Sequence, residues 1–150
     1  MKKYLVILLC FISSVFCFAE DFKGFLNIPF GSTQSTCLSE MKKKGYKFDR
    51  QQPVGDLDVS VFNGSSFAGK EIDSICLMFE SNYLKCVSIT FIYKTDAYNV
   101  FNAYIKKYNL ISEENMFITK DRKYIFDYSQ NAIMIFEHDS SSDYIDDSDI

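Results

Sequence analysis

The sequence predicts one α+β domain: an antiparallel β-sheet packed by two helices, in the order helix-βββ-helix-βββ. That order would also suit two similar halves. Two stretches have apolar residues at helical spacing. Each is followed by a group of short runs in which apolar and polar residues alternate. Turn-forming residues separate the runs within each group. Hydrophobic residues make up 47% of the chain, which is enough for a single core.

The first helix is predicted over residues 33–44. Pro29-Phe30-Gly31 indicates a turn, and Ser32 or Thr33 can cap the helix that follows. Cys37, Leu38 and Met41 lie on one side. Lys42-Lys43-Lys44 occupies the last turn, where the helix dipole favours cations, and Gly45 ends the helix. We interpret the lysines as this charge complement rather than as a binding patch.

Three strands are predicted next, at Asp58–Phe62, Ile72–Glu80 and Leu84–Tyr93. The last two form a hairpin, and the alternation of their apolar residues places Leu77 opposite Val87 and Ile75 opposite Ile89. A two-residue turn would shift this register, so we expect a longer loop centred on Ser81, Asn82 and Tyr83.

The second helix is predicted over residues 95–108, capped by Thr95 or Asp96, with a broad apolar stripe. Short strands at Met116–Thr119, Lys123–Tyr128 and Ala132–Glu137 complete the order.

Both ends of the chain differ from this domain, which we assign to residues 20–137. Residues 1–19 read as a secretory signal peptide, with Lys2 and Lys3 before an apolar run and Cys17-Phe18-Ala19 before the cleavage point. An uncleaved anchor is a weaker alternative, because the run is shorter than the roughly 20 residues of a spanning helix. A lipoprotein is weaker too, because it needs small residues before its cysteine, and Cys17 follows Val15-Phe16 while Cys10 follows Leu8-Leu9. Residues 138–150 hold five Asp and no Lys or Arg, which predicts a flexible acidic tail. We therefore expect a periplasmic or secreted protein without a stable membrane span after cleavage.

Charge and cysteine content limit the possible partners and cofactors. Residues 20–137 hold fifteen acidic and fourteen basic side chains, so no basic stripe predicts nucleic-acid binding. Cys37, Cys76 and Cys86 follow the signal segment, and an odd number leaves at least one thiol free. Their apolar neighbours favour small buried side chains over a disulfide, whose pairing the sequence leaves open. No motif indicates a metal or another cofactor.

The sequence offers few groups for catalysis, and we expect the protein not to be an enzyme. His138 is the one histidine and lies where the last strand meets the tail. The tail carboxylates lack the glycine and the closing glutamate of a calcium loop. Four carboxylates, Asp56, Asp58, Asp73 and Asp127, keep an enzymatic alternative open, although turn or surface roles explain them equally well.

The loop at residues 65–70 is the candidate for binding a partner. It places Phe67 and Lys70 among small residues between two strands, where an aromatic ring at a hairpin tip could anchor another protein. The alternative is that Phe67 folds back onto the sheet.

One part of the chain resembles a known group. Phe25-Leu-Asn-Ile-Pro-Phe-Gly-Ser-Thr before a helix, Lys-Gly-Tyr-Lys-Phe at 44–48, and Ser66-Phe-Ala-Gly before paired strands are similar to features of small, exported, uncharacterised bacterial proteins that carry an F-x-G-I-P-F-G-S-like phrase. Asn27 stands where that phrase has Gly, and the helix lacks acidic residues in its first turn. Those proteins are broadly similar to BamE-like and beta-lactamase-inhibitor-like α+β domains. The resemblance spans residues 22–93 and implies a helix-on-sheet fold without a catalytic residue to carry over.

These observations favour an exported, non-enzymatic module that binds another macromolecule in the cell envelope or the medium. The alternative is a carrier of an apolar small ligand, with a pocket between helix and sheet lined by Phe and Tyr side chains.

Overall fold

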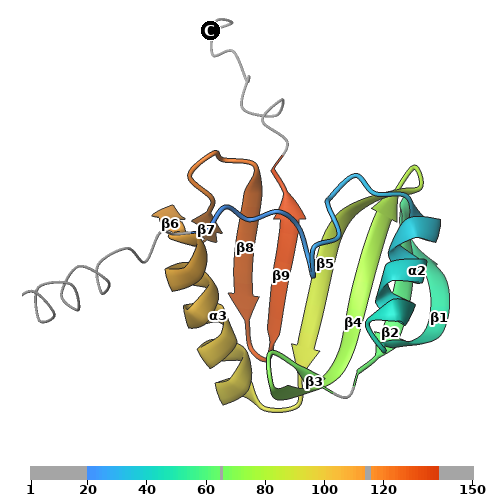
Figure 1. Cartoon of the computed structure of the whole chain (residues 1–150), viewed down its shortest axis with the longest axis horizontal. Helices are drawn as coiled ribbons and strands as arrows, with labels where there is room; N and C mark the ends of the chain where they lie inside the picture. Colours follow the sequence, from blue (N-terminus) through green and yellow to red (C-terminus); the bar gives the residue numbers. More distant parts are fainter. Residues whose placement is uncertain (1–19, 65, 114–115, 139–150) are drawn as a thin grey trace, which may run out of the picture.

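The structure, a computed structural model, describes residues 20–64, 66–113 and 116–138 (Figure 1). The predicted signal peptide and the tail beyond His138 lie outside these ranges. The elements, in chain order, are α2 (Gln34–Lys43), β1 (Lys47–Val54), β2 (Leu57–Asn63), β3 (Ser66–Phe67), β4 (Lys70–Glu80), β5 (Tyr83–Phe91), α3 (Lys94–Tyr108), β6 (Ile111–Glu113), β7 (Met116–Ile118), β8 (Tyr124–Ser129) and β9 (Ala132–Glu137). Within the described ranges, no helix is long and apolar enough to cross a membrane.

The strands form one antiparallel sheet in the order β1-β2-β4-β5-β9-β8-β7-β6, with β3 paired to β4 beside this path. The α+β class and both helix positions are confirmed. The strand count is corrected: β1 and β6 were not predicted, so in the described chain each helix is followed by four strands of the path instead of three. The last strand of each group, β5 and β9, pair at the centre of the sheet.

The β4–β5 hairpin has the predicted register but reaches it differently. Leu77 pairs with Val87 and Ile75 with Ile89, as the alternation indicated. The turn, however, has two residues, Ser81 and Asn82, both with positive φ, as hairpin turns of this length require. A β-bulge follows, where the pairing passes from Phe79↔Leu84 to Met78↔Cys86. The extra residue of the bulge, Lys85, restores the register that the short turn would otherwise shift.

The two helices begin and end for different local reasons. Thr33 caps α2, and its side chain accepts a hydrogen bond from the Thr36 amide at 3.4 Å. The predicted cap of the second helix is wrong, because α3 begins after Tyr93 without a side-chain cap, and Asp96 pairs with Lys70 instead. Asn109 ends α3 in the left-handed conformation.

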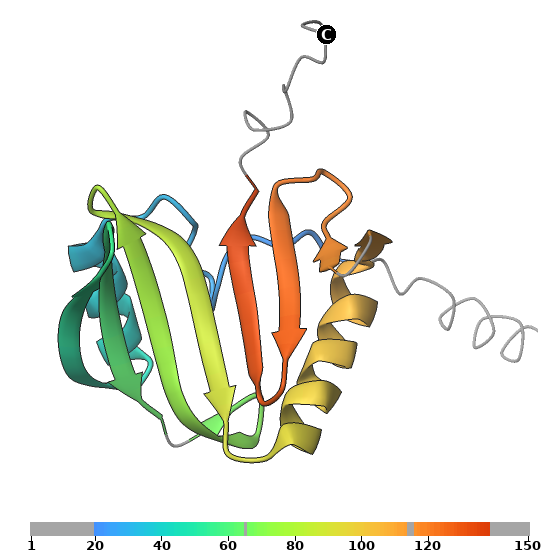
Figure 2. The same cartoon turned by 180° about the vertical axis from the view of Figure 1, so that it is seen from behind.

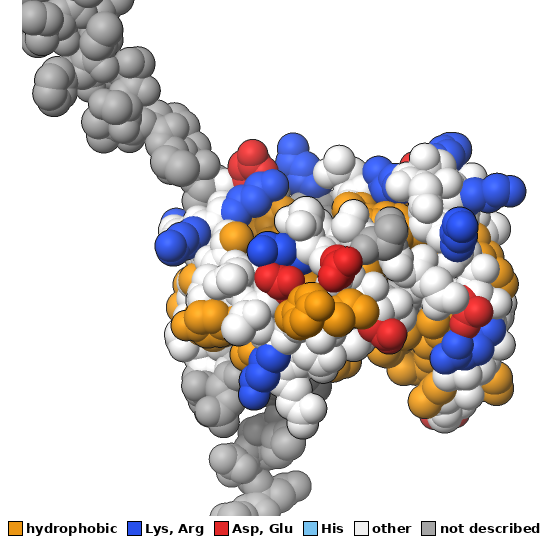
Figure 3. Space-filling view, turned by 90° about the horizontal axis from the view of Figure 1, so that it is seen from below, with side chains coloured by type: hydrophobic (Ala, Val, Ile, Leu, Met, Phe, Trp, Pro, Cys, Tyr) orange, Lys and Arg blue, Asp and Glu red, His pale blue; other side chains and the backbone are white. Residues whose placement is uncertain are grey.

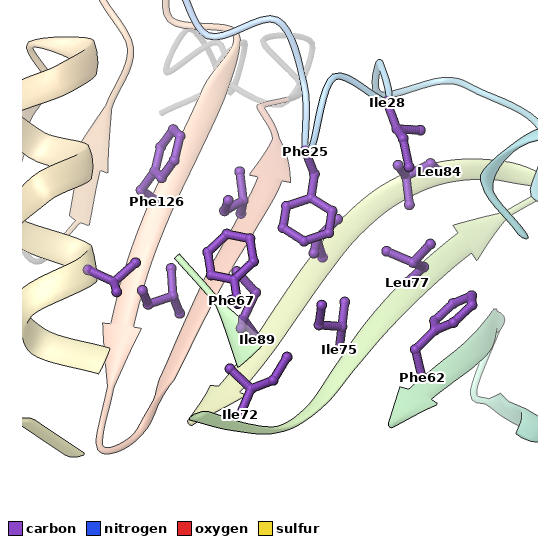
Figure 4. Packing of buried hydrophobic residues seen from close by; sticks show 14 of the residues in the cluster. Phe25, Ile28, Phe62, Phe67, Ile72, Ile75, Leu77, Leu84, Ile89 and Phe126 are labelled. Carbon is purple, nitrogen blue, oxygen red and sulfur yellow. The ribbon is translucent and has the colours of Figure 1, made fainter. Parts of the chain in front are cut away.

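The core lies between one face of the sheet and a layer made of both helices and the N-terminal segment (Figures 1 and 4). Phe22 from that segment makes edge contacts with Tyr108 and Phe126, so the first described residues pack on the second half of the chain. Gln34 on α2 donates to the hydroxyl of the fully buried Ser60 at 3.2 Å. We call the opposite side of the sheet, seen in Figure 2, the back face.

Candidate functional site

Phe67 lies in the core, which corrects the prediction of an exposed anchor. Its side chain is 6% exposed, and the short β3 folds the ring inward over the sheet (Figure 4). The ring stacks on Phe25 with centroids 5.6 Å apart. Edge contacts at 6.3 and 6.4 Å join it to Phe91 and Tyr104. The alternative reading, that Phe67 folds back onto the sheet, is therefore correct.

Lys70, the other residue predicted to contact a partner, stays at the surface. Its Nζ lies 3.0 Å from Oδ1 of Asp96, near the start of α3. The pair ties the β3–β4 turn to the helix. A shallow surface groove of about 390 Å³ runs beside it along α3. Partner binding by Lys70 stays a prediction.

Among the described strands, the edge strand β1 is the one whose residues are all exposed. All eight of its residues are exposed, and its pairing with β2 uses only one of its two sides. In the described chain no strand occupies the other side. An unpaired edge presents a row of amide and carbonyl groups, to which an extended segment of another chain can add as a strand.

An apolar pocket lies at the start of this edge. It has a volume of about 450 Å³ and opens between the end of α2 and the beginning of β1. Leu38, Tyr46 and Phe48 form its apolar wall, and Lys42 and Lys47 stand on its rim. Phe48 is 51% exposed, although one edge of its ring packs on Phe62 at 5.8 Å between centroids. A side chain from an incoming strand could fill this pocket.

Positive charge gathers at the same corner. Lys43 pairs with Glu40 at 2.7 Å, and Arg50 pairs with Asp49. Lys42, Lys44 and Lys47 form no ion pair within the described residues. The corner therefore has an excess of cations. We call β1, the pocket and these three lysines the β1 corner.

The back face carries apolar side chains in register across six strands. One row runs from β2 to β7 and consists of Val59, Met78, Cys86, Phe136, Ile125 and Ile118. Three of these are almost inaccessible: Val59 and Ile125 are 6% exposed and Ile118 is 2% exposed. No described helix lies against this side, so we infer that the curvature of the sheet shields them. Seen from below, the outline of the molecule is notched on the side where Figure 1 places β1 and β2 (Figure 3).

A surface pocket of about 640 Å³ lies at the middle of this row. Cys86 and Phe136 form its floor, and Lys85 pairs with Glu137 at 2.7 Å on its rim. Burial, and then the neighbouring Cys76, raise the pKa of the Cys86 thiol to about 11. Burial is also the main cause that raises the pKa of Cys76. Both thiols are free, as is that of Cys37, a buried residue of α2.

The four carboxylates that kept an enzymatic alternative open are spread over the fold. Asp56 lies in the β1–β2 turn, Asp58 on β2, Asp73 on β4 and Asp127 on β8. Among the residues that the structure describes, no three His, Cys, Asp or Glu side chains are grouped to hold a metal ion. The space between helices and sheet, which a small-ligand carrier would need, is filled by packed rings and aliphatic side chains.

Sequence reasoning missed the β1 corner because residues 47–54 are polar and contain Pro53. The signal that could have found it is Gly55-Asp56, which forms a two-residue turn between Val54 and Leu57.

Comparisons with protein-family models, with curated proteins and with solved structures give no match.

Proposed function

We propose that this protein is an exported, non-enzymatic module that binds another protein of the envelope or the medium, and that the partner adds an extended segment to β1. The observation that carries the proposal is the edge strand itself, eight exposed residues long with one side unpaired in the described chain. Strand addition draws its affinity from main-chain hydrogen bonds and its specificity from side-chain pockets.

The chemistry of the β1 corner defines the partner segment. Lys42, Lys44 and Lys47 favour acidic side chains and disfavour a second copy of the β1 corner, whose three lysines would repel them. The apolar pocket beside Phe48 favours one aliphatic or aromatic side chain in the segment. We therefore expect an acidic strand with a single apolar anchor.

Site-specific photo-crosslinking in the native cells tests this proposal. A photoreactive residue replaces Gln52 on β1 or, as a control, Gln130 in the exposed β8–β9 turn. We expect a discrete crosslinked partner from position 52 and not from position 130. The crosslinked peptide should be acidic.

Charge variants make the test specific. Replacing Lys42, Lys44 and Lys47 together by Glu should abolish the crosslink from position 52. Replacing Lys94, Lys106 and Lys120 by Glu is the matched control, because it changes net charge equally and also alters one lysine in the last turn of a helix. A crosslink that survives the first set, or no crosslink from position 52, would contradict the proposal.

A further inference from the structure

The register places four sulfur-containing side chains on the back face. They belong to β4, β5 and β9, which are neighbouring strands of the sheet (Figure 2). Cys76 and Met78 lie two residues apart on β4, and Met78 pairs with Cys86 on β5. Cys76 pairs with Ser88, which in turn pairs with Met134 on β9. All four sulfur side chains are partly buried.

The register places these groups within reach of one another. Side chains directly opposite on antiparallel strands have Cβ atoms about 4.5–5.5 Å apart, and diagonal neighbours are about 7–8 Å apart. Met78 is opposite Cys86, and Cys76 and Met134 are both diagonal neighbours of Cys86. Three sulfur atoms, those of Cys76, Met78 and Cys86, can therefore converge on one point, with Met134 beside them.

We propose that Cys76, Met78 and Cys86, with Met134 as a fourth ligand, form a binding site for Cu(I). Thiolate and thioether sulfur are soft donors that select Cu(I) over hard cations, and thioether donors distinguish this set from the thiolate and imidazole ligands of structural zinc sites. One carboxylate borders the group in the described register, because Asp127 on β8 lies directly opposite Met134. The site is independent of the β1 corner and of its proposed partner.

Binding of Cu(I) by the two thiols is balanced in bonds, protons and charge. When both thiols bind Cu(I), two S–H bonds break, two Cu–S bonds form and two protons leave to solvent, without any change in the oxidation state of copper or sulfur. The resulting centre carries one negative charge.

A disulfide between Cys76 and Cys86 is the competing use of the two thiols. Cys76 and Cys86 are diagonal neighbours, and such side chains are about 7–8 Å apart. A disulfide requires the two Cα atoms to lie within about 7 Å of each other. A shared metal ion bridges two sulfur atoms over a longer distance than an S–S bond does. The geometry therefore favours metal binding.

The test is a titration of the reduced protein with Cu(I) under anaerobic conditions, in competition with a chromophoric Cu(I) chelator. We expect one Cu(I) per protein and a sulfur-only first shell by X-ray absorption. Cys76→Ser and Cys86→Ser should each weaken binding by more than about 100-fold, since even the loss of an outer-shell partner costs 10–100-fold. Met78→Leu should weaken it less while keeping the side-chain volume.

Two controls separate ligation from folding. Met116→Leu changes an exposed methionine on β7 and should leave Cu(I) affinity unchanged. Thermal melting should show that the serine variants remain folded. Failure to retain Cu(I) against the chelator would overturn the proposal. Binding that survives both serine variants, or a first shell of nitrogen and oxygen, would overturn it equally.

Discussion

Phe67 shows how one side chain connects distant parts of the chain. It joins Phe25 of the N-terminal segment, Phe91 at the end of β5 and Tyr104 of α3. Removing the ring would leave a cavity that none of these elements can fill without moving. We predict that Phe67→Ala lowers the free energy of unfolding by about 3–5 kcal/mol, and Phe67→Leu by less. Urea denaturation measures both, and an unchanged midpoint for the alanine variant would place Phe67 at the surface after all.

The buried thiol of Cys37 links stability to alkaline pH. Burial raises the pKa of Cys37 from 9.0 to about 11. Below pH 9 the thiol is protonated in both folded and unfolded chains, so its contribution is fully present. Between pH 9 and 11 the unfolded thiol ionises while the folded one keeps its proton, which lowers the free energy of unfolding.

The measurement is the free energy of unfolding between pH 9 and 11, in the wild type and in Cys37→Ser. The difference between the two slopes against pH isolates the contribution of the thiol, because serine does not ionise in this range. We expect a shallower slope for the variant. Equal slopes would show that Cys37 titrates alike in both states.

At the scale of the element, the bulge at Lys85 explains how a two-residue turn and the observed register coexist. Deleting Lys85 should leave a regular hairpin in which Leu77 still pairs with Val87. The deletion also removes the partly exposed Lys85–Glu137 ion pair, worth about 1 kcal/mol or less. Deleting Ser88 from the same strand should prevent folding, since it moves Ile89 and Phe91 to the back face.

Nuclear Overhauser contacts between the Leu77 and Val87 side chains, together with thermal melting, measure this difference. A Lys85 deletion that unfolds as completely as the Ser88 deletion would show that the bulge itself is needed for the fold.

The same elements show what sequence patterns could predict. The register of β4 and β5 follows from alternation, since one buried face leaves a single pairing that covers Ile75, Leu77, Val87 and Ile89. The turn could not be inferred in the same way, because a bulge compensates for its length. Strand β1 has no buried residue, so no apolar alternation marks it. Phe67 was assigned to a loop because β3 has only two residues.

At the scale of the whole molecule, the two helix–strand groups depend on each other. The central pairing of β5 with β9 joins them, and Phe22 packs on Phe126 of the second group. We predict that residues 20–92 and residues 93–150, expressed separately, remain largely unfolded by circular dichroism and recover structure when mixed. A fragment that melts cooperatively by itself would show an independent folding unit.

The sequence could predict the helices and the core but not the β1 corner or the sulfur-containing group. Both sites arise from pairing between strands: the corner exists because β1 is left at an edge, and Met134 approaches Cys86 only because β9 pairs with β5. Such proximity depends on strand order, which the spacing of residues along the chain does not specify.

The central claim is tested most directly by residue-resolved hydrogen exchange. The measurement compares the protein alone with the protein bound to the partner that the photoreactive residue at position 52 identifies. The account predicts that amides on the unpaired side of β1 exchange rapidly in the free protein and become protected in the complex, with less protection at high salt. Protection confined to β6, α3 or the back face, with β1 unchanged, would contradict it.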